Sequence, residues 1–335
     1  MELIKNKEFG GERPLYCRRS LRLEGVTIHA GESALKETAD IEADGCRFEG
    51  KYPFWCCERF TVRNCLFTEG ARAALWYSKG LLMEDTLVEA PKMFREMEDL
   101  TLRRVRIPNA AETLWSCRGV TLEDVEIEKG DYLFMHSSDL KVNSLKLQGN
   151  YSFQYAKNVE IRNSVLNTKD AFWETENVTV FDSVINGEYL GWYSKGLRLV
   201  NCRIGGTQPL CYATGLVLEN CVLDADADLA FEYSDVQADI RGAVTSVKNS
   251  ASRKMTVKWG KNPKASGYQV QYSTSKTFAG GNKIVSAAGT STVSKVIASL
   301  TRGKTYYVRV RAYKTVNNVK FFSAWSAAKS VKITK

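Results

Sequence analysis

LRLVNCRI, at residues 197–204, decides the fold because its pattern returns throughout the first two thirds of the chain. The pattern is apolar, any residue, apolar, any residue, polar, small, any residue, apolar, and further copies are FTVRNCLF (60–67), VTLEDVEI (120–127), VEIRNSVL (159–166) and LVLENCVL (216–223). Successive units begin 19–21 residues apart, at Leu21, Ile41, Phe60, Leu81, Leu100, Val120, Leu140, Val159, Val178, Leu197 and Leu216. Self-similarity at this period predicts a solenoid in which each unit forms one coil.

The alternation of apolar residues distinguishes between two kinds of solenoid. A leucine-rich repeat carries an asparagine within LxxLxLxxN, and these units lack it. Side chains of a β-strand point alternately to two faces, which matches the units, and helical periodicity is absent. The sequence therefore predicts an all-β fold, a parallel β-helix of about 11 rungs over residues 21–241, with residues 1–20 as an N-terminal cap.

The fifth and sixth positions of the units indicate a bend between two strands of each coil. Asn, Asp and Gly, which tolerate a left-handed backbone, recur at the fifth position. They are Gly25, Gly45, Asn64, Asp85, Asp124, Asn163, Asp182, Asn201 and Asn220. The sixth position is small or apolar, and we expect it to line the interior as Val26, Cys46, Cys65, Val105, Val125, Ser164, Ser183, Cys202 and Cys221.

The cysteines favour free thiols over a disulfide framework. All nine precede residue 222, their number is odd, and no CxxC pair suggests a zinc or redox site. Four of them occupy the inward sixth position. We therefore expect unpaired cysteines in a reducing compartment, and neither a metal site nor a cofactor.

The hexapeptide WYSKGL occurs at residues 76–81 and again at 192–197, six coils apart. Its Trp lies five residues before the unit start. Residues at this position form a column that contains Trp55, Trp76, Trp115, Trp173 and Trp192. The next position carries Glu37, Tyr77, Glu96, His136, Tyr155, Glu174, Tyr193, Tyr212 and Glu232. The residue six before the start is almost always Leu or Phe, which predicts an inward side chain.

Two interpretations of these columns stay open at this point. In the first, a bend leaves both columns exposed, and aromatic faces with carboxylates between them bind a glycan. Its ligand-binding residues are Trp55, Trp76, Trp115, Trp173, Trp192, Tyr77, Tyr155, Tyr193, Tyr212, Glu37 and Glu232. In the second, the tryptophans fill the core and only the Tyr/Glu column meets solvent.

Catalytic residues are harder to assign. Glu96, Asp170 and Glu174 supply carboxylates of the kind that cleave glycosidic bonds, but their spacing matches no recognised pattern. For neighbouring pairs such as Lys36 with Glu37, a surface ion pair is the simpler explanation. The carboxylates therefore remain candidates for an acid and a base.

Several segments together resemble a bacterial family catalogued only as a domain of unknown function. They are GERPLY (11–16), GESALKE (31–37), YPFW (52–55), RAALWYS (72–78), YSFQY (151–155), TKDAFW (168–173), GEYLGWY (187–193), GTQPLCY (206–212) and DADLAFE (226–232). The resemblance covers about residues 1–241. It implies a right-handed, pectin-lyase-like β-helix and no assigned activity.

The segment 242–335 has a different texture, with short alternating strands such as MTVKW (255–259), GYQVQYS (267–273) and TYYVRVRAYK (305–314). The spacing of Leu300 and Tyr306 suits a tyrosine corner, and the segment resembles a fibronectin type III β-sandwich. In the long strand we expect Tyr307, Arg309, Arg311 and Tyr313 to form an exposed stripe.

Charge divides the chain at the same place. Residues 242–335 hold 18 Lys and Arg and no Asp or Glu, whereas residues 1–241 have a net charge of −9. We expect the basic segment to hold polyanions, with no specific nucleic acid as partner.

Three functions compete. The first is a glycan-binding protein, the second a polysaccharide lyase or glycoside hydrolase on the same face, and the third a scaffold or adhesion protein that binds a protein partner. No apolar run approaches the roughly 18 residues of a transmembrane helix, and no signal peptide is visible. Free cysteines favour the cytoplasm, while the fibronectin-like segment suggests the cell surface or secretion.

Overall fold

The structure, a computed structural model, describes residues 1–335 except 225, 241–243, 263–264, 317–318 and 324. The chain divides into two compact units, one of Met1–Val217 with Leu223–Gln237 and the other of Ala238–Lys335 with Leu218–Val222. The first is a parallel β-solenoid of about 12 turns, which confirms the predicted β-helix. No helix among the described residues is long and apolar enough to cross a membrane.

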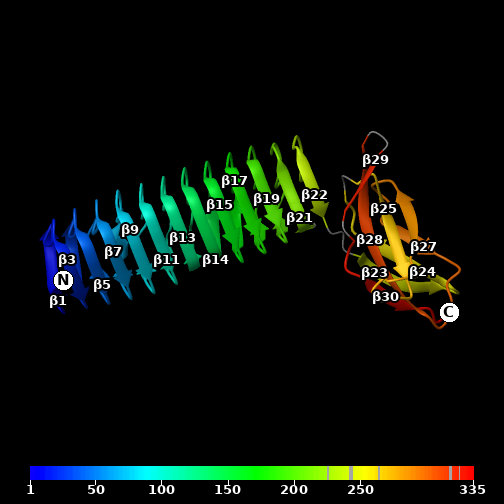
Figure 1. Cartoon of the computed structure of the whole chain (residues 1–335), viewed down its shortest axis with the longest axis horizontal. Helices are drawn as coiled ribbons and strands as arrows, with labels where there is room; N and C mark the ends of the chain where they lie inside the picture. The colour runs from blue at the N-terminus through cyan, green and yellow to red at the C-terminus, as the bar shows by residue number, and fades with distance from the viewer. Residues whose placement is uncertain (225, 241–243, 263–264, 317–318, 324) are drawn as a thin grey trace. The chain divides into compact units, whose positions relative to one another are not determined.

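Strands at the start of each coil lie side by side along the solenoid (Figure 1). They are β1 (Glu2–Lys5), β3 (Arg19–Glu24), β5 (Ala39–Asp44), β7 (Glu58–Arg63), β9 (Lys79–Glu84), β11 (Glu98–Arg103), β13 (Arg118–Ile127), β14 (Ser138–Asn150), β15 (Lys157–Arg162), β17 (Glu176–Phe181), β19 (Lys195–Val200), β21 (Leu216–Leu223) and β22 (Val236–Ile240). Their register stacks the unit starts, as when Leu100 pairs with Leu81 on one side and Val120 on the other.

A second row of short strands follows the bend. It contains β2 (Glu8–Glu12), β4 (Thr27–Glu32), β6 (Arg47–Phe48), β8 (Leu66–Phe67), β10 (Leu87–Val88), β12 (Arg106–Ile107), β16 (Val165–Lys169), β18 (Val184–Asn186) and β20 (Arg203–Gly205), with one 3-10 turn, η1 (Glu69–Ala71). The strands β1 and β2 pair with β3 and β4 as later coils do. The expected cap, residues 1–20, thus has the geometry of a coil.

The predicted bend is confirmed position by position. Every fifth-position residue named above has a left-handed backbone, from Asp85 at φ 48° to Gly45 at φ 61°. Every sixth-position residue named above is buried, and none of the nine cysteines is in a disulfide. Cys17 and Cys56 are exposed, and the other seven cysteines are buried.

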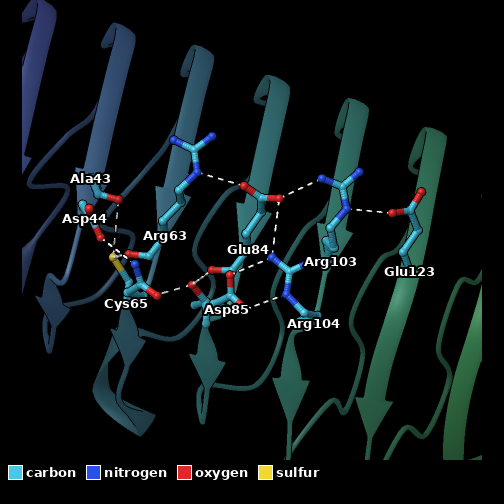
Figure 2. Close-up of polar contacts among 11 residues, drawn as sticks. Ala43, Asp44, Arg63, Cys65, Glu84, Asp85, Arg103, Arg104 and Glu123 are labelled. Carbon is cyan, nitrogen blue, oxygen red and sulfur yellow. Dashed lines mark hydrogen bonds and ion pairs between the residues drawn. The ribbon is translucent and has the colours of Figure 1, made fainter.

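Opposite charges alternate from coil to coil on the outer side of the first strands (Figure 2). The Glu84 carboxylate accepts hydrogen bonds from Arg63 and Arg103, each at 2.8 Å, and Arg103 also donates to Glu123 at 2.7 Å. The two guanidinium groups lower the pKa of Glu84. Because like charges directly opposite each other destabilise a sheet, this alternation favours the stacked register.

The second unit contains two antiparallel sheets, compatible with a β-sandwich. One sheet has β23 (Val244–Ala251), β24 (Lys254–Trp259) and β27 (Ser294–Ile297). The other has β25 (Gly267–Ser273), β26 (Lys283–Ala288), β28 (Thr305–Val316), β29 (Val319–Phe322) and β30 (Lys329–Lys332). The Tyr306 hydroxyl accepts a hydrogen bond from the Thr301 N–H at 3.1 Å, as a tyrosine corner requires. The fibronectin type III assignment stays a prediction.

Candidate functional site

The outer Trp and Tyr/Glu columns share one corner of the solenoid, which we call the aromatic face. Residues four before the unit starts have a left-handed backbone, including Tyr77 at φ 55°, Glu96 at φ 51° and Glu174 at φ 51°. Glu232 is the exception, because Tyr233 takes this position in the last coil, at φ 55°. This conformation interrupts the strict alternation of side chains. Both columns therefore reach the surface, while the Leu/Phe column, including Phe94 and Phe134, stays buried.

The tryptophans are neither core nor free surface. Trp55, Trp76, Trp115, Trp173 and Trp192 are all half-buried, whereas Tyr77 and Tyr193 are 45% and 43% exposed. Tyr155 and Tyr212 are half-buried, and Glu37, Glu96, Glu174 and Glu232 are exposed. Neither interpretation of the sequence described this intermediate burial of the indole rings.

The repeated hexapeptide ties each coil to the next through its indole N–H. Trp76 donates to the carbonyl oxygen of Lys92 and Trp192 to that of Gln208, in both cases at 2.8 Å and 16 residues ahead. Trp115 makes the equivalent bond to Tyr132. A bond from a side chain to the backbone of the next coil gives Trp at these positions a structural role.

Stacking along the solenoid covers the faces of these rings. The Arg95 guanidinium lies 4.4 Å from the ring centroid of Trp76 and 4.6 Å from that of Trp115, between the two. Tyr212 lies with its centroid 5.1 Å from both Tyr193 and Tyr233. Because pyranose stacking needs an open ring face, the aromatic face offers mainly ring edges to a ligand.

Further stacks and polar contacts place the rest of the predicted residues. The centroids of Trp55 and Trp76 are 5.3 Å apart and those of Trp173 and Trp192 are 5.6 Å apart. Tyr155 stacks on His136 at 4.7 Å. Two of the carboxylates already accept hydrogen bonds, Glu37 from the Tyr16 hydroxyl at 2.8 Å and Glu174 from the Trp173 indole at 3.3 Å.

A groove of about 650 Å³ lies next to this corner, at the end of the second row of strands. It extends over four successive coils and is lined by Glu128, Lys129, Asp131, Gln148, Gly149, Asn150, Asn167, Thr168, Lys169, Gly187 and Glu188. Its side chains are polar without exception. The groove was not predicted, and its residues were absent from the sequence-based site.

Glycines create the groove because the coils touch backbone to backbone there. A Cβ on Gly149 would lie 2.5 Å from the carbonyl carbon of Gly130, and one on Gly187 would lie 2.1 Å from the carbonyl oxygen of Thr168. No side chain can occupy either position, so the flanking side chains border a depression. A glycine recurring at Gly130, Gly149, Gly187 and Gly206 was the sequence signal for it.

Hydrogen bonds hold part of the groove wall in place. Asp131 accepts from both the backbone and the side-chain amide of Asn150, at 2.8 and 3.0 Å. Asn167 accepts from the Asn186 amide at 3.0 Å. Lys169 lies with its amino group 5.6 Å from the ring centroid of Tyr151. The wall therefore combines fixed amides with exposed charged groups.

Asp170 directly follows the groove residue Lys169 in the sequence, is not itself in the groove lining, and is only 8% exposed. Its backbone N–H donates to the carbonyl oxygen of Glu188 at 2.8 Å. Burial raises the pKa of the Asp170 carboxyl; the positive charge of Lys169 acts against this and the negative charge of Glu188 acts with it. Of the three catalytic candidates, Asp170 is next in sequence to a groove residue, whereas Glu96 and Glu174 lie on the aromatic face.

Several solved structures are distantly similar to this chain. The mannuronan C-5 epimerase AlgE4 A-module of Azotobacter vinelandii is 9% identical with a TM-score of 0.34, covering 71% of this chain and 87% of that chain. A tailspike protein mutant of E. coli bacteriophage HK620 is 8% identical with a TM-score of 0.29, covering 93% of this chain and 73% of that chain. A structure described as a myokine is 16% identical with a TM-score of 0.23, covering 28% of this chain and 97% of that chain. Scores this low support no inference about activity.

The sequence comparisons are more decisive. No curated protein matches the chain. Residues 2–263, more than three quarters of the sequence, match the family described as "Protein of unknown function (DUF3737)". The chain belongs to this family.

Proposed function

We propose that the solenoid binds an extended polysaccharide in the groove between Glu128 and Glu188. The observation that carries the proposal is the groove itself, about 650 Å³ with exclusively polar side chains in its lining. This volume lies within the range of about 300–1,000 Å³ that is typical of ligand sites. The polar groups of its Glu, Lys, Asp, Gln and Asn side chains favour a ligand covered with hydroxyl groups.

The chemistry of the lining matches sugar hydroxyls, which both donate and accept hydrogen bonds. The amides of Gln148 and Asn167 can do both, Lys129 donates, and the carboxylate of Glu188 accepts. Gln148, Lys129, Asn167 and Glu188 are all exposed. A hydroxyl-rich ligand therefore finds complementary groups on each coil of the groove.

The length of the groove selects an extended ligand over a compact one. The four coils are separated by three intervals of roughly 4.8 Å each, about 14 Å in total. Polar groups recur at that interval because each coil contributes at least one polar side chain. A polymer with a regular repeat fits such a series better than a small metabolite does.

The aromatic face extends this site in the proposal. Tyr155, Trp173 and Glu174 belong to the coils that form the groove and follow its residues by four to seven positions. Their ring edges and carboxylate would contact substituents of the bound chain. Trp192 and Tyr193 likewise follow Glu188 on the fourth coil of the groove. Trp55 and Trp76 lie on earlier coils and have structural contacts that account for them.

A second function, cleavage of the bound polysaccharide, is favoured by Asp170. A buried carboxyl with a raised pKa next to a second carboxylate is the arrangement that supplies a general acid in many glycosidases. In this proposal Asp170 holds the proton that is delivered to the leaving group. Release of reducing ends from a bound polysaccharide, lost in Asp170→Asn while binding persists, would support cleavage.

The test of binding is affinity electrophoresis of the full chain through gels that contain different neutral and acidic polysaccharides. Asn167→Ala and Gln148→Ala should each restore free migration in the gel that retards the wild type. Asn143→Ala is the matched control, because Asn143 is also exposed and accepts an amide hydrogen bond, from Asn163 at 2.8 Å, but lies outside the groove. Equal effects of Asn167→Ala and Asn143→Ala would contradict the proposal.

A further inference from the structure

Among the described residues, Arg309 and Arg311 of the second unit bond to amide oxygens and not to carboxylates. Residues 242–335 contain no Asp or Glu side chain. Arg309 and Arg311 differ from the surface lysines because both are half-buried. They lie two positions apart on β28, roughly 7 Å along one face of the strand.

Gln side chains directly across the sheet orient both guanidinium groups. In the register of β25 and β28, Gln271 is opposite Arg309 and Gln269 is opposite Arg311. The Arg309 Nε donates to Gln271 at 2.6 Å, and Arg311 donates to Gln269 through Nε at 3.0 Å and through a terminal nitrogen at 2.7 Å. The amides fix the orientation of the planar groups without neutralising their charge.

Aromatic rings alternate with the two guanidinium groups. Arg309 lies 4.2 Å from the ring centroid of Phe278 and 5.1 Å from that of Trp325. Arg311 lies 4.4 Å from the centroid of Trp325 and 4.0 Å from that of Phe322. The five side chains form a stack of ring, guanidinium, ring, guanidinium, ring.

We propose that Arg309 and Arg311 form a binding site for the carboxylate groups of an acidic polysaccharide. A planar guanidinium binds a carboxylate through two parallel hydrogen bonds, and preorganisation lowers the entropy lost on binding. Burial without a counter-charge lowers the pKa of both arginines, so a bound anion would relieve an unfavourable charge. Nucleic acid is disfavoured as the ligand because guanidinium groups already cover faces of Trp325 that bases would stack on.

The site is in a different unit from the groove and does not depend on it. The sequence predicts an exposed stripe of Tyr307, Arg309, Arg311 and Tyr313, and this prediction is wrong about their exposure. Tyr313 is buried, at 6% exposure, because its ring packs against Phe322 with centroids 5.9 Å apart. Tyr307, like the two arginines, is half-buried.

The test measures binding of the full chain to polygalacturonate at about 50 and 200 mM salt. The double variant Arg309→Gln/Arg311→Gln should weaken binding at least about tenfold. The slope of log affinity against log salt concentration should become shallower by roughly two, since two charges are removed. Arg309→Lys/Arg311→Lys keeps both charges but not the planar fork, and should lose most of the affinity. Near-wild-type melting of this lysine variant shows that the unit is folded.

Control variants separate this site from diffuse charge and from the groove. Lys254→Gln/Lys258→Gln removes two exposed charges from β24 and should change the affinity by less than about threefold. Asn167→Ala should leave the salt-dependent binding unchanged. The proposal is overturned if the β24 variant weakens binding as much as the arginine variant, if Asn167→Ala abolishes it, or if an oligothymidylate binds the wild type more tightly than polygalacturonate does.

Discussion

Replacing Trp76 separates a structural role of the aromatic face from a role in ligand binding. Its indole N–H bonds to the backbone of Lys92, its ring lies under the Arg95 guanidinium, and its side chain is half-buried. Loss of the hydrogen bond costs about 1 kcal/mol and loss of the cation–π contact about 1 kcal/mol. Half of the cost of truncating a buried Trp adds about 2 kcal/mol. Trp76→Ala should therefore cost about 4 kcal/mol, and Trp76→Phe, which loses chiefly the hydrogen bond, about 1 kcal/mol.

Differential scanning calorimetry of the full chain measures this prediction. For a unit of this size 1 kcal/mol corresponds to about 2–4 °C, so the solenoid transition should fall by roughly 8–16 °C in Trp76→Ala and 2–4 °C in Trp76→Phe. Trp173→Phe is the control, because its N–H donates to the exposed Glu174 carboxylate and not to the next coil. A melting temperature within about 2 °C of wild type for Trp76→Ala would refute the structural role.

Three other predictions concern thiols and titratable groups. Cys17 and Cys56 are exposed and should react with a thiol reagent in the native state. Cys117 should react only after unfolding, because burial raises its pKa to about 12. Rapid labelling of Cys117 in the native state would contradict the fold. Asp170 has a raised pKa, so its contribution to stability is present in full below the ordinary pKa of Asp and is lost as the pH rises through the raised value. Asp170→Asn should accordingly raise the melting temperature at pH 7 but not at pH 3, and a lower value at pH 7 would speak against a buried, costly carboxylate. Hydrogen bonds to two glutamates raise the pKa of His29. The stabilisation from protonated His29 is therefore complete below about pH 6.5 and is lost as the pH rises through the raised pKa. The melting temperature of His29→Gln should depend less on pH between 6 and 8 than that of the wild type.

The fold followed from the sequence because each coil repeats the same local chemistry. Asn64 and Asp182 occupy bends that need a left-handed backbone, and Cys65 and Ser183 occupy inward positions that admit only small side chains. These requirements act within a single coil. They therefore appear in the sequence as columns of similar residues.

The surface could not be predicted as well because its geometry depends on contacts between coils. Glu96 and Tyr77 adopt a left-handed backbone although neither residue type favours it, so the simultaneous exposure of two adjacent columns has no strong signature. The groove depends on the absence of side chains at Gly149 and Gly187. A search for chemically active side chains overlooks such positions.

The dependence of affinity on ligand length tests the proposed polysaccharide groove most directly. Oligosaccharides of increasing length, prepared from the polysaccharide that retards the chain most, would be titrated into the full chain by isothermal titration calorimetry. A groove of about 14 Å predicts that the affinity rises with each sugar until the four coils are spanned and then levels off, and that Asn167→Ala lowers it at every length. An affinity that is independent of length, or unchanged in Asn167→Ala, would contradict the groove as the binding site.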